Sequence, residues 1–346
     1  MKLGIGIDVW SQPTLEIPME KIRAVEQMGF DSVWTAEIYG ADAVTPLVYI
    51  AAHTEHLRLG TAVMQVAARP PVTCAMQMGS LDAMSGGRAI AGLGLSGPQI
   101  VEGWYGQPWG RPNRRLRDYV EIMRQVFRRE GPVVQDSDEI SLPYTGPGSV
   151  GVGKPLKSIL HMNPDIPIWL ASGGPANVAL MAELADGWLP LGYTPDSAHL
   201  YRDALDKGLA RSGRTMADLE VQVGCSVKIT DDVAGCLAES KGQIAFLVGG
   251  YGTKEYNFHR DAMVRRGYGD AAERVQELFL AGRRDEAVLA VPDEYIDDGG
   301  LYGSEQRIRE RFDRWASTDA TGMTIRTEQP EALQLMADLC ELRPRS

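Results

Sequence analysis

Two hydrophobic periodicities alternate along the first half of the chain. Short apolar runs typical of strands are each followed by a segment whose apolar residues recur at helical spacing. Residues 2–8 (KLGIGID) predict a strand, and Ile22, Val25 and Met28 lie on one face of the helix that follows. The same alternation predicts strands at 31–37, 57–65 and 88–95 and helices at 45–54, 70–85 and 113–129. The chain therefore begins as four strand–helix pairs.

A Pro-, Gly- and Ser-rich segment at 131–165 interrupts this rhythm, and a segment of this length is typical of a functional loop or cap. The stretch IPIWLASGGPANVALMAELADGWLP (166–190) then predicts a strand, a helix and another strand. A seventh strand is predicted at 219–229. Residues 232–318 are predicted to be mainly helical, with an irregular stretch near 251–270. A last strand at 321–326 and a helix at 330–341 complete the pattern.

Eight short strands, each followed by a helix, predict a parallel sheet. The count of eight favours closure into a (β/α)8 TIM-type barrel over a doubly wound open sheet. No linker divides the chain, so residues 1–346 are predicted to form a single barrel domain with insertions near 131–165 and 251–300.

The composition is that of an ordinary globular protein, with 44% hydrophobic and 23% charged residues. A net charge of −11 argues against a nucleic-acid or anionic-membrane partner, since either needs a basic surface. No run of 18 apolar residues is present, and the first residues enter a strand without a signal-peptide pattern. We therefore expect a soluble cytoplasmic protein.

In a TIM-type barrel the chemistry lies at the carboxyl ends of the strands, which directs attention to the turns that follow them. The turn Ser172-Gly173-Gly174-Pro175 places bare backbone amides at a helix start, where the helix dipole favours an anion. A phosphate cradle and a simple well-capped helix start both fit this pattern. The small residues in LGTAVMQ (59–65) have two interpretations: a flat apolar platform for a ligand, or ordinary packing in the barrel core.

The segment GLGLSG (92–97) formally matches the dinucleotide-binding fingerprint. Three strand–helix units precede it, and no strand-ending acid follows about 20 residues later, so that interpretation is disfavoured. A glycine-rich strand exit that lets a flat ligand approach the backbone fits better. His53 and His56 have no third ligand at a strand end, and no metal site is predicted.

Four stretches together resemble the bacterial luciferase-like superfamily, and more closely its coenzyme F420-dependent oxidoreductases. They are GFDSVWTAE, LRLGTAVMQVAARPP, MSGGRAIAGLGLSGPQIVEGWYG and the segment 166–190. The resemblance covers about the first 195 residues closely and the remainder loosely. It implies a (β/α)8 barrel that holds the cofactor at the carboxyl mouth of the strands, and a homodimer.

The resemblance also implies roles for individual residues. A non-prolyl cis peptide between Ala62 and Val63, with Gln65 just beyond, backs the deazaflavin ring. The ring and ribityl chain lie along the turn after the fourth strand, made of Gly94, Leu95, Ser96 and Gly97. The phosphate is held by Ser172, Gly173, Gly174 and Pro175. Because the two rings are similar, FMN is the alternative cofactor.

The chain departs from the sugar-phosphate dehydrogenase branch of the family, which has an Asp-His pair after the second strand and an acid after the fourth. Here these stretches read TAEIYG and GLSGPQ. Glu37 occupies the acidic position after the second strand. Its expected role is a proton relay or a hydrogen-bond partner of the ring, and the alternative is an ion pair at the barrel rim. The substrate side is predicted to be shaped by Asp8, Trp10, Tyr39, Trp104, Tyr105 and Tyr193.

These features predict hydride transfer between C5 of F420 and a small organic substrate. Reduction of an electron-poor C=C or C=N bond is favoured over alcohol oxidation, because reduced F420 is a strong hydride donor. An FMN-dependent monooxygenase and a non-catalytic flavin or F420 carrier are the alternatives. Residues 131–165 and 251–300 are expected to wall the substrate site, but their composition does not specify a substrate.

Overall fold

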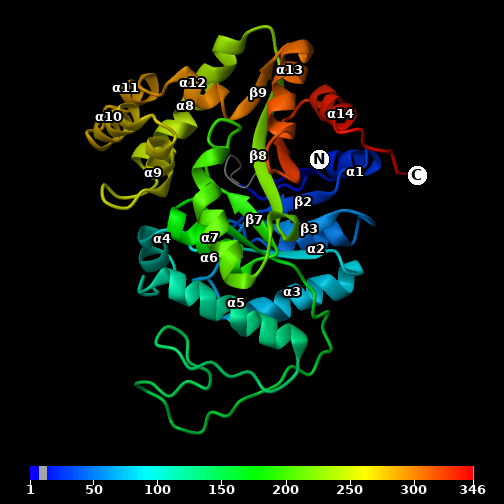
Figure 1. Ribbon diagram of the computed structural model, residues 1–346, viewed down its shortest axis with the longest axis vertical. Helices are drawn as coiled ribbons and strands as arrows, with labels where there is room; N and C mark the ends of the chain where they lie inside the picture. Colours follow the sequence, from blue (N-terminus) through cyan, green and yellow to red (C-terminus); the bar gives the residue numbers. More distant parts are fainter. Residues whose placement is uncertain (8–13, 346) are drawn as a thin grey trace.

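The computed structural model describes residues 1–7 and 14–345. Within them, eight parallel strands form a closed barrel (Figure 1), because β10 pairs with both β1 and β8. In barrel order the strands are β1 (Lys2–Gly6), β2 (Ser32–Thr35), β3 (Arg58–Thr61), β5 (Ala89–Gly94), β6 (Ile168–Ser172), β7 (Gly187–Pro190), β8 (Glu220–Ile229) and β10 (Gly322–Arg326). The predicted TIM-type barrel is confirmed, and the open-sheet alternative is wrong.

Two short strands lie outside this ring. β4 (Met64–Gln65) pairs with the end of β5, and β9 (Gly300–Gly303) pairs with the end of β8. The sequence predicted one strand over 57–65, and it gave no sign of β9 within a region expected to be mainly helical. Both short strands extend the sheet at the carboxyl ends of longer ones.

Helices surround the barrel, and most predicted ranges agree within a few residues. The outer layer comprises α1 (Met19–Gln27), α2 (Thr45–Ala51), α3 (Pro71–Ser85), α4 (Pro98–Gly103), α5 (Pro112–Arg128), α6 (Pro175–Leu184), α7 (Arg202–Ser212), α13 (Glu305–Ala316) and α14 (Pro330–Leu339), with 3-10 turns η1 (Ala198–Tyr201) and η2 (Met216–Asp218). The short helix α4 was not predicted.

Helix α5 illustrates why the spacing of apolar residues predicted the helices. Its apolar residues Leu116, Val120, Met123 and Phe127 recur at spacings of three and four and are all buried. Charged residues occupy the opposite face, so the helix packs its apolar stripe on the barrel. The burial of such a stripe, rather than helix propensity, provides most of the stability of the helix.

Side chains fill the barrel interior. Trp34 and Trp169 are buried with ring centroids 5.1 Å apart. They fit because neighbouring strands carry glycines: a Cβ at Gly60 would lie 2.3 Å from the Trp34 ring, and one at Gly187 2.3 Å from the Trp169 ring. The tryptophans make the interior a packed core, so ligands are expected at the carboxyl mouth and not within the barrel.

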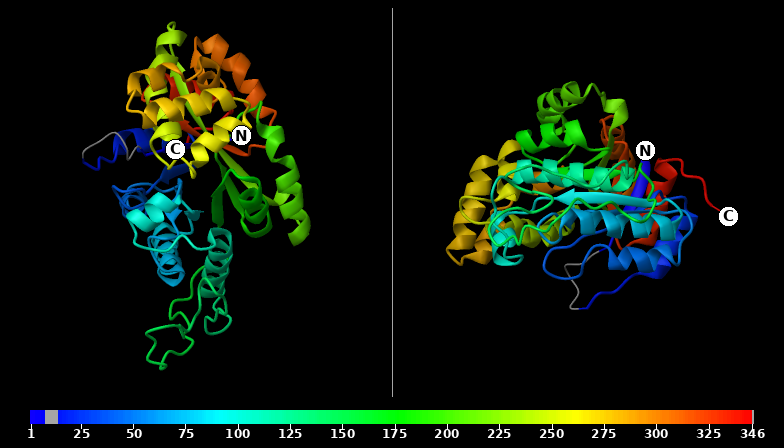
Figure 2. Two further views of the ribbon diagram at one scale, coloured as in Figure 1. Left: turned by 90° about the vertical axis from the view of Figure 1, so that its left-hand side faces the viewer. Right: turned by 90° about the horizontal axis from the view of Figure 1, so that it is seen from below.

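The first insertion, residues 131–165, contains no helix or strand apart from isolated bridges. Figure 2 shows it extending from the end of α5 away from the strands. Its contacts include Ser137 on Asp118 of α5 and Asn163 on Asp82 of α3. These contacts lie on the helical layer of the barrel.

The second insertion is helical and lies between β8 and β9. It contains α8 (Val233–Gly249), α9 (Phe258–Arg265), α10 (Gly269–Leu280), α11 (Arg284–Leu289) and α12 (Asp293–Asp297), which pack around an apolar cluster separate from that of the barrel. The expected irregular stretch near 251–270 instead contains α9, which begins where the Asn257 side chain accepts hydrogen bonds from the amides of His259 and Arg260.

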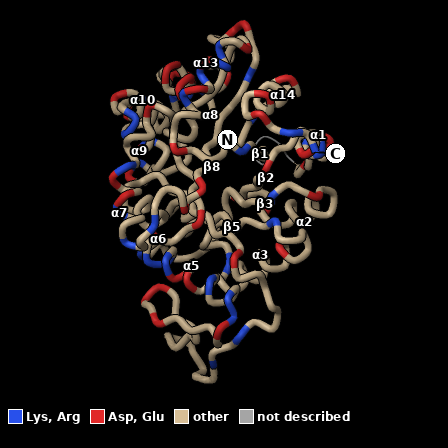
Figure 3. Tube along the Cα trace, turned by 45° about the vertical axis from the view of Figure 1, so that its right-hand side comes forward, with Lys and Arg blue, Asp and Glu red and all other residues tan. Residues whose placement is uncertain are grey.

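No helix in the described parts of the chain is long and apolar enough to cross a membrane. Figure 3 shows acidic and basic residues interspersed along the trace.

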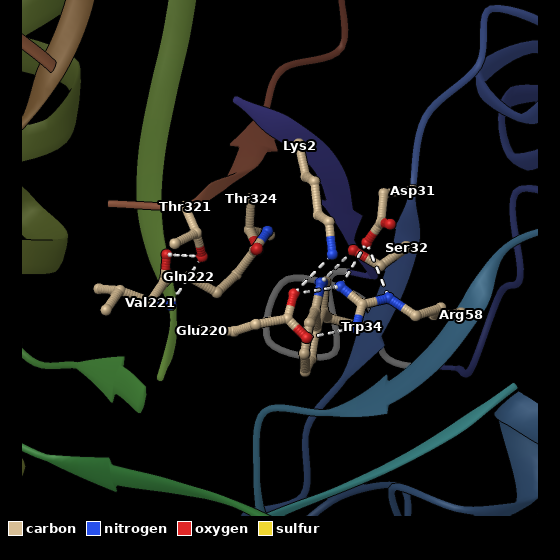
Figure 4. A network of polar contacts seen from close by, with 10 residues as sticks. All are labelled: Lys2, Asp31, Ser32, Trp34, Arg58, Glu220, Val221, Gln222, Thr321 and Thr324. Atoms are coloured by element: carbon tan, nitrogen blue, oxygen red, sulfur yellow. Dashed lines mark hydrogen bonds and ion pairs between the residues drawn. The ribbon is translucent and has the colours of Figure 1, made fainter. Parts of the chain in front are cut away.

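An arginine links the amino ends of non-neighbouring strands, as Figure 4 shows. Arg58 at the start of β3 donates to Asp31 at 2.7 Å and, with two nitrogens, to Glu220 of β8 at 2.8 and 2.9 Å. Lys2 of β1 also donates to Glu220 at 2.8 Å. Burial raises the pKa of Glu220, but the Arg58 and Lys2 bonds outweigh it, so the net shift is downward.

We therefore expect Arg58→Met to lower the free energy of unfolding by about 1–3 kcal/mol near neutral pH. Because the pKa of Glu220 is lowered on folding, this contribution is present above the ordinary pKa of 4.5 and is lost as the pH falls below it. Urea unfolding between pH 4 and 8 measures it. Lys2→Met, which breaks one exposed pair, is the control, and equal losses from both variants would contradict the assignment.

Candidate functional site

The chain changes direction where β3 ends. The peptide bond between Ala62 and Val63 is cis, as the resemblance implied, and β4 follows directly. Val63 then lies against the end of β5, where a Cβ at Gly94 would come 2.4 Å from the Val63 Cγ2 atom. Gly94 must therefore lack a side chain for this approach. Gly94 is itself buried, so the partly exposed Val63 forms the surface of this Val63–Gly94 platform at the mouth of the barrel.

The Glu37 carboxylate is buried beside this platform. Its Oε1 accepts from the Gln65 amide at 2.8 Å, and its Oε2 accepts from Arg69 at 2.6 Å and from the Ala43 amide at 3.2 Å. The Glu37 backbone also pairs with this segment, since its amide donates to the Val63 carbonyl and its carbonyl accepts from the Gln65 side chain. These contacts agree with the ion-pair alternative for Glu37.

Arg69 keeps its positive charge although it is buried. Burial lowers the pKa of Arg69, but its hydrogen bond and charge interaction with Glu37 outweigh burial, so the net shift is upward. Arg69 therefore stays cationic. Tyr105 lies near this pair, and its pKa is raised, first by burial and then by the negative charge of Glu37.

Three of the predicted substrate residues come together at the rim. Tyr39 and Trp104 meet edge to face with centroids 6.3 Å apart, and both are substantially exposed. The Tyr105 hydroxyl donates to the Ile38 carbonyl at 3.1 Å, which joins the end of α4 to the exit of β2. The three aromatic rings form one rim, which we call the aromatic rim.

Tyr251 and His259, from the second insertion, extend this region and were not predicted individually. The Gln99 side chain donates to the Tyr251 carbonyl at 2.9 Å, and the Tyr251 ring lies 5.3 Å from that of His259. Burial raises the pKa of Tyr251, while a hydrogen bond with Ser96 opposes that rise. Burial also lowers the pKa of His259 to about 4, so this imidazole is neutral at pH 7. The available sequence signal for Tyr251 and His259 was the number of aromatic residues in the stretch near 251–270 that was predicted to be irregular.

Tyr193, another predicted substrate residue, does not join the aromatic rim. Tyr193 is buried, stacked on Tyr201 at 5.8 Å and edge-on to Trp188 at 5.7 Å. It belongs to that aromatic cluster and not to the aromatic rim. Asp8 and Trp10 lie outside the described residues.

The turn between β6 and α6, residues 172–175, presents hydrogen-bond donors without partners. Gly174 precedes Pro175, the first residue of α6, and the amides of a first helical turn have no carbonyl partner within the helix. Ser172 is buried, and its Oγ bonds to no described residue. A Cβ at Gly174 would meet nothing within 4 Å, so there is open space above the turn.

Arg265, at the end of α9, reaches the same turn. Its Nη2 lies 3.5 Å from the position that a Cβ would take at Gly173. Its buried Nε has no hydrogen-bond partner among the described residues. Ser172, the glycines and Arg265 together provide the donors and the positive charge that an oxyanion requires. The sequence missed Arg265 because 90 residues separate it from the turn.

Other candidate features have structural partners. Arg114, Arg115 and Arg117 face Asp138, Glu139 and Glu183 respectively. These ion pairs occupy the arginines at the start of α5. His53 contacts the Tyr49 carbonyl through Nδ1 at 2.7 Å. Among the described residues, no group of three or more His, Cys, Asp or Glu side chains could hold a metal ion.

The model of the luciferase-like monooxygenase family matches residues 9–322. The chain belongs to this family. A Mycobacterium tuberculosis relative, provisionally named as a coenzyme F420-dependent oxidoreductase, is 44% identical over 98% of this chain and 99% of its own. The resemblance to the luciferase-like superfamily is thereby confirmed.

Two solved structures support the luciferase-like fold. The coenzyme F420-dependent tetrahydromethanopterin reductase of Methanopyrus kandleri has a TM-score of 0.78 at 21% identity and covers 99% of both chains. An F420-dependent secondary alcohol dehydrogenase has a TM-score of 0.73 at 15% identity and covers 99% of this chain and 98% of its own. At such identities the likeness shows that the fold is shared.

We expect Glu37→Gln to lower the free energy of unfolding by about 3 kcal/mol, because it leaves the buried Arg69 cation without its anion. Arg69→Met should cost a similar amount. The double variant should lose less than the sum, and the cycle measured by urea unfolding gives the coupling. Additive losses would mean that the two residues do not act as a pair.

Proposed function

We propose that this luciferase-like protein is an F420-dependent oxidoreductase that transfers a hydride between the deazaflavin and a small organic substrate. The structural observation that supports it most is the unpartnered Ser172 hydroxyl beside the open space over Gly174, on the same barrel face as the Val63–Gly94 platform. The relative that is 44% identical over nearly the whole chain supports the choice of F420.

The residues present fit such a cofactor. Val63, which packs on the buried Gly94, offers an apolar surface for a flat ring, with Gln65 beside it and the turn of Leu95, Ser96 and Gly97 beyond. The turn with Ser172, Gly173, Gly174 and Pro175 offers amides and a hydroxyl for a phosphate. The platform lies at the ends of β3 and β5, and the turn follows β6. These three strands are consecutive in the barrel, so the two features lie along one side of its mouth.

When bound, the deazaflavin supplies or accepts a hydride at its C5 atom. The chain contributes orientation. Glu37 and Arg69 hold Gln65 and, through backbone pairing, Val63, so that the platform does not shift when a ring lies on it. Glu37 thus acts here as a positioning residue. The aromatic rim bounds the side from which a substrate approaches.

Reduction of an electron-poor C=C or C=N bond fits the rim better than alcohol oxidation. Oxidation needs a base for the hydroxyl proton, but both Glu37 oxygens are occupied and the next residue is the apolar Ile38. Reduction needs a proton donor, and the Tyr251 phenol keeps its proton at pH 7, because its ordinary pKa of 10 is raised further by burial. The Tyr105 hydroxyl already donates to the Ile38 carbonyl, so it serves the rim as a structural contact.

Titration of the purified, cofactor-free protein with F420, and separately with FMN, tests the proposal by fluorescence. We expect F420 to bind at least about tenfold more tightly than FMN. The reverse preference would favour the monooxygenase chemistry of the family name, with oxygen consumption as its assay. Binding of F420 without turnover of any enone, imine or dehydroamino acid would favour a carrier.

Gly174→Ala tests the phosphate position. The added methyl group points into open space, so the free energy of unfolding should change by less than about 1 kcal/mol. If a phosphate lies on the Gly174 backbone, the methyl group displaces it, and F420 affinity should fall about tenfold or more. Gly242→Ala, which also meets nothing within 4 Å but lies on α8, is the control. Unchanged affinity in Gly174→Ala would place the phosphate elsewhere.

A further inference from the structure

A cavity lies immediately beyond the phosphate turn. It has a volume of about 200 Å³ and lies between the loop that follows β7, residues 194–200, and the end of α9 at Arg265 to Gly267. Asp298 closes one side. Nothing in the account above uses this space, although Arg265 lines it and also reaches Gly173.

Two acids, Asp196 and Asp298, and two arginines, Arg265 and Arg266, line the cavity. Asp196 pairs with Arg314, and Asp298 accepts from the Tyr268 hydroxyl and lies 3.8 Å from Arg266. Arg266 is further engaged, because it donates to the Tyr295 carbonyl and stacks over the Tyr295 ring at 4.0 Å. Both acids are therefore compensated by cations other than Arg265.

Arg265 remains without a counter-ion. It makes no hydrogen bond or ion pair with any described residue, and its Nε is shielded from solvent. The side chain as a whole is partly exposed, so its terminal nitrogens are available to an anion that enters the cavity. Since Arg265 lies between residues 172–175 and the cavity, an anionic ligand held at the turn and continuing past Arg265 would enter this space.

We propose that the cavity receives the carboxylate-bearing tail of F420, and that Arg265 contacts the tail where it leaves the phosphodiester. This inference rests on the proposed function. FMN ends at its phosphate and has nothing to place in the cavity, so the cavity distinguishes the two cofactors. Arg265 is then an anchor supplied to the barrel by the second insertion.

The first test compares three probes by fluorescence titration: F420 with a glutamate tail, F420 that carries phospholactate but no glutamate, and the phosphate-free deazaflavin with its ribityl chain. Arg265→Ala should weaken both phosphate-bearing forms by about tenfold to a hundredfold and leave the phosphate-free form unchanged. Arg274→Ala, an exposed arginine on α10, is the control and should bind all three like the wild type.

The second test places a negative charge in the cavity itself. Leu200 lines it and is 41% exposed, so Leu200→Glu should fold normally, which its melting temperature checks. The variant should weaken the glutamate-bearing form by about threefold or more through charge repulsion, weaken the phospholactate form less because it carries one carboxylate, and leave the phosphate-free form unchanged. Leu289→Glu makes the same change on an exposed leucine of α11 and should have no effect.

The outcomes separate the two proposals. If the wild type binds no deazaflavin, the proposed function fails. If it binds F420 but Arg265→Ala weakens all three probes equally or none, the anchor is wrong. If Leu200→Glu has the same effect on F420 with and without glutamate, the tail does not occupy the cavity.

Discussion

The buried contact between Glu37 and Arg69 is the interaction on which the candidate site depends. The carboxylate is saturated by Arg69 and by two backbone amides, and one of these belongs to Gln65, directly after the turn at Ala62 and Val63. An ion pair shielded from water is costly to form and more costly to break, so it favours one arrangement of its surroundings. The arrangement it favours here keeps Val63 against the bare backbone of Gly94.

The site arises from segments with different origins in the fold. The barrel strands supply the platform and the turn at residues 172–175, which sit at their carboxyl ends as in other α/β barrels. The second insertion, with its own apolar core, supplies Tyr251, His259 and Arg265.

Local patterns in the sequence were enough to predict the barrel and the turns. Strand and helix periods predicted the eight barrel strands, and the resemblance to the luciferase-like superfamily implied the cis bond at Ala62–Val63. Residues that depend on long-range packing were not accessible in this way. Arg265 lies beside the turn at residues 172–175 although about 90 residues of sequence separate them. β9 forms a strand by pairing with the end of β8. Tyr193 is buried because it packs against Tyr201 and Trp188.

A crystal structure of the protein with F420 would test the central claim most directly. The account predicts that one face of the deazaflavin lies on Val63 and Gly94, that the phosphate contacts the backbone at Gly173 and Gly174, and that the tail passes Arg265. A ring bound away from Val63, or a phosphate at the end of another strand, would contradict it.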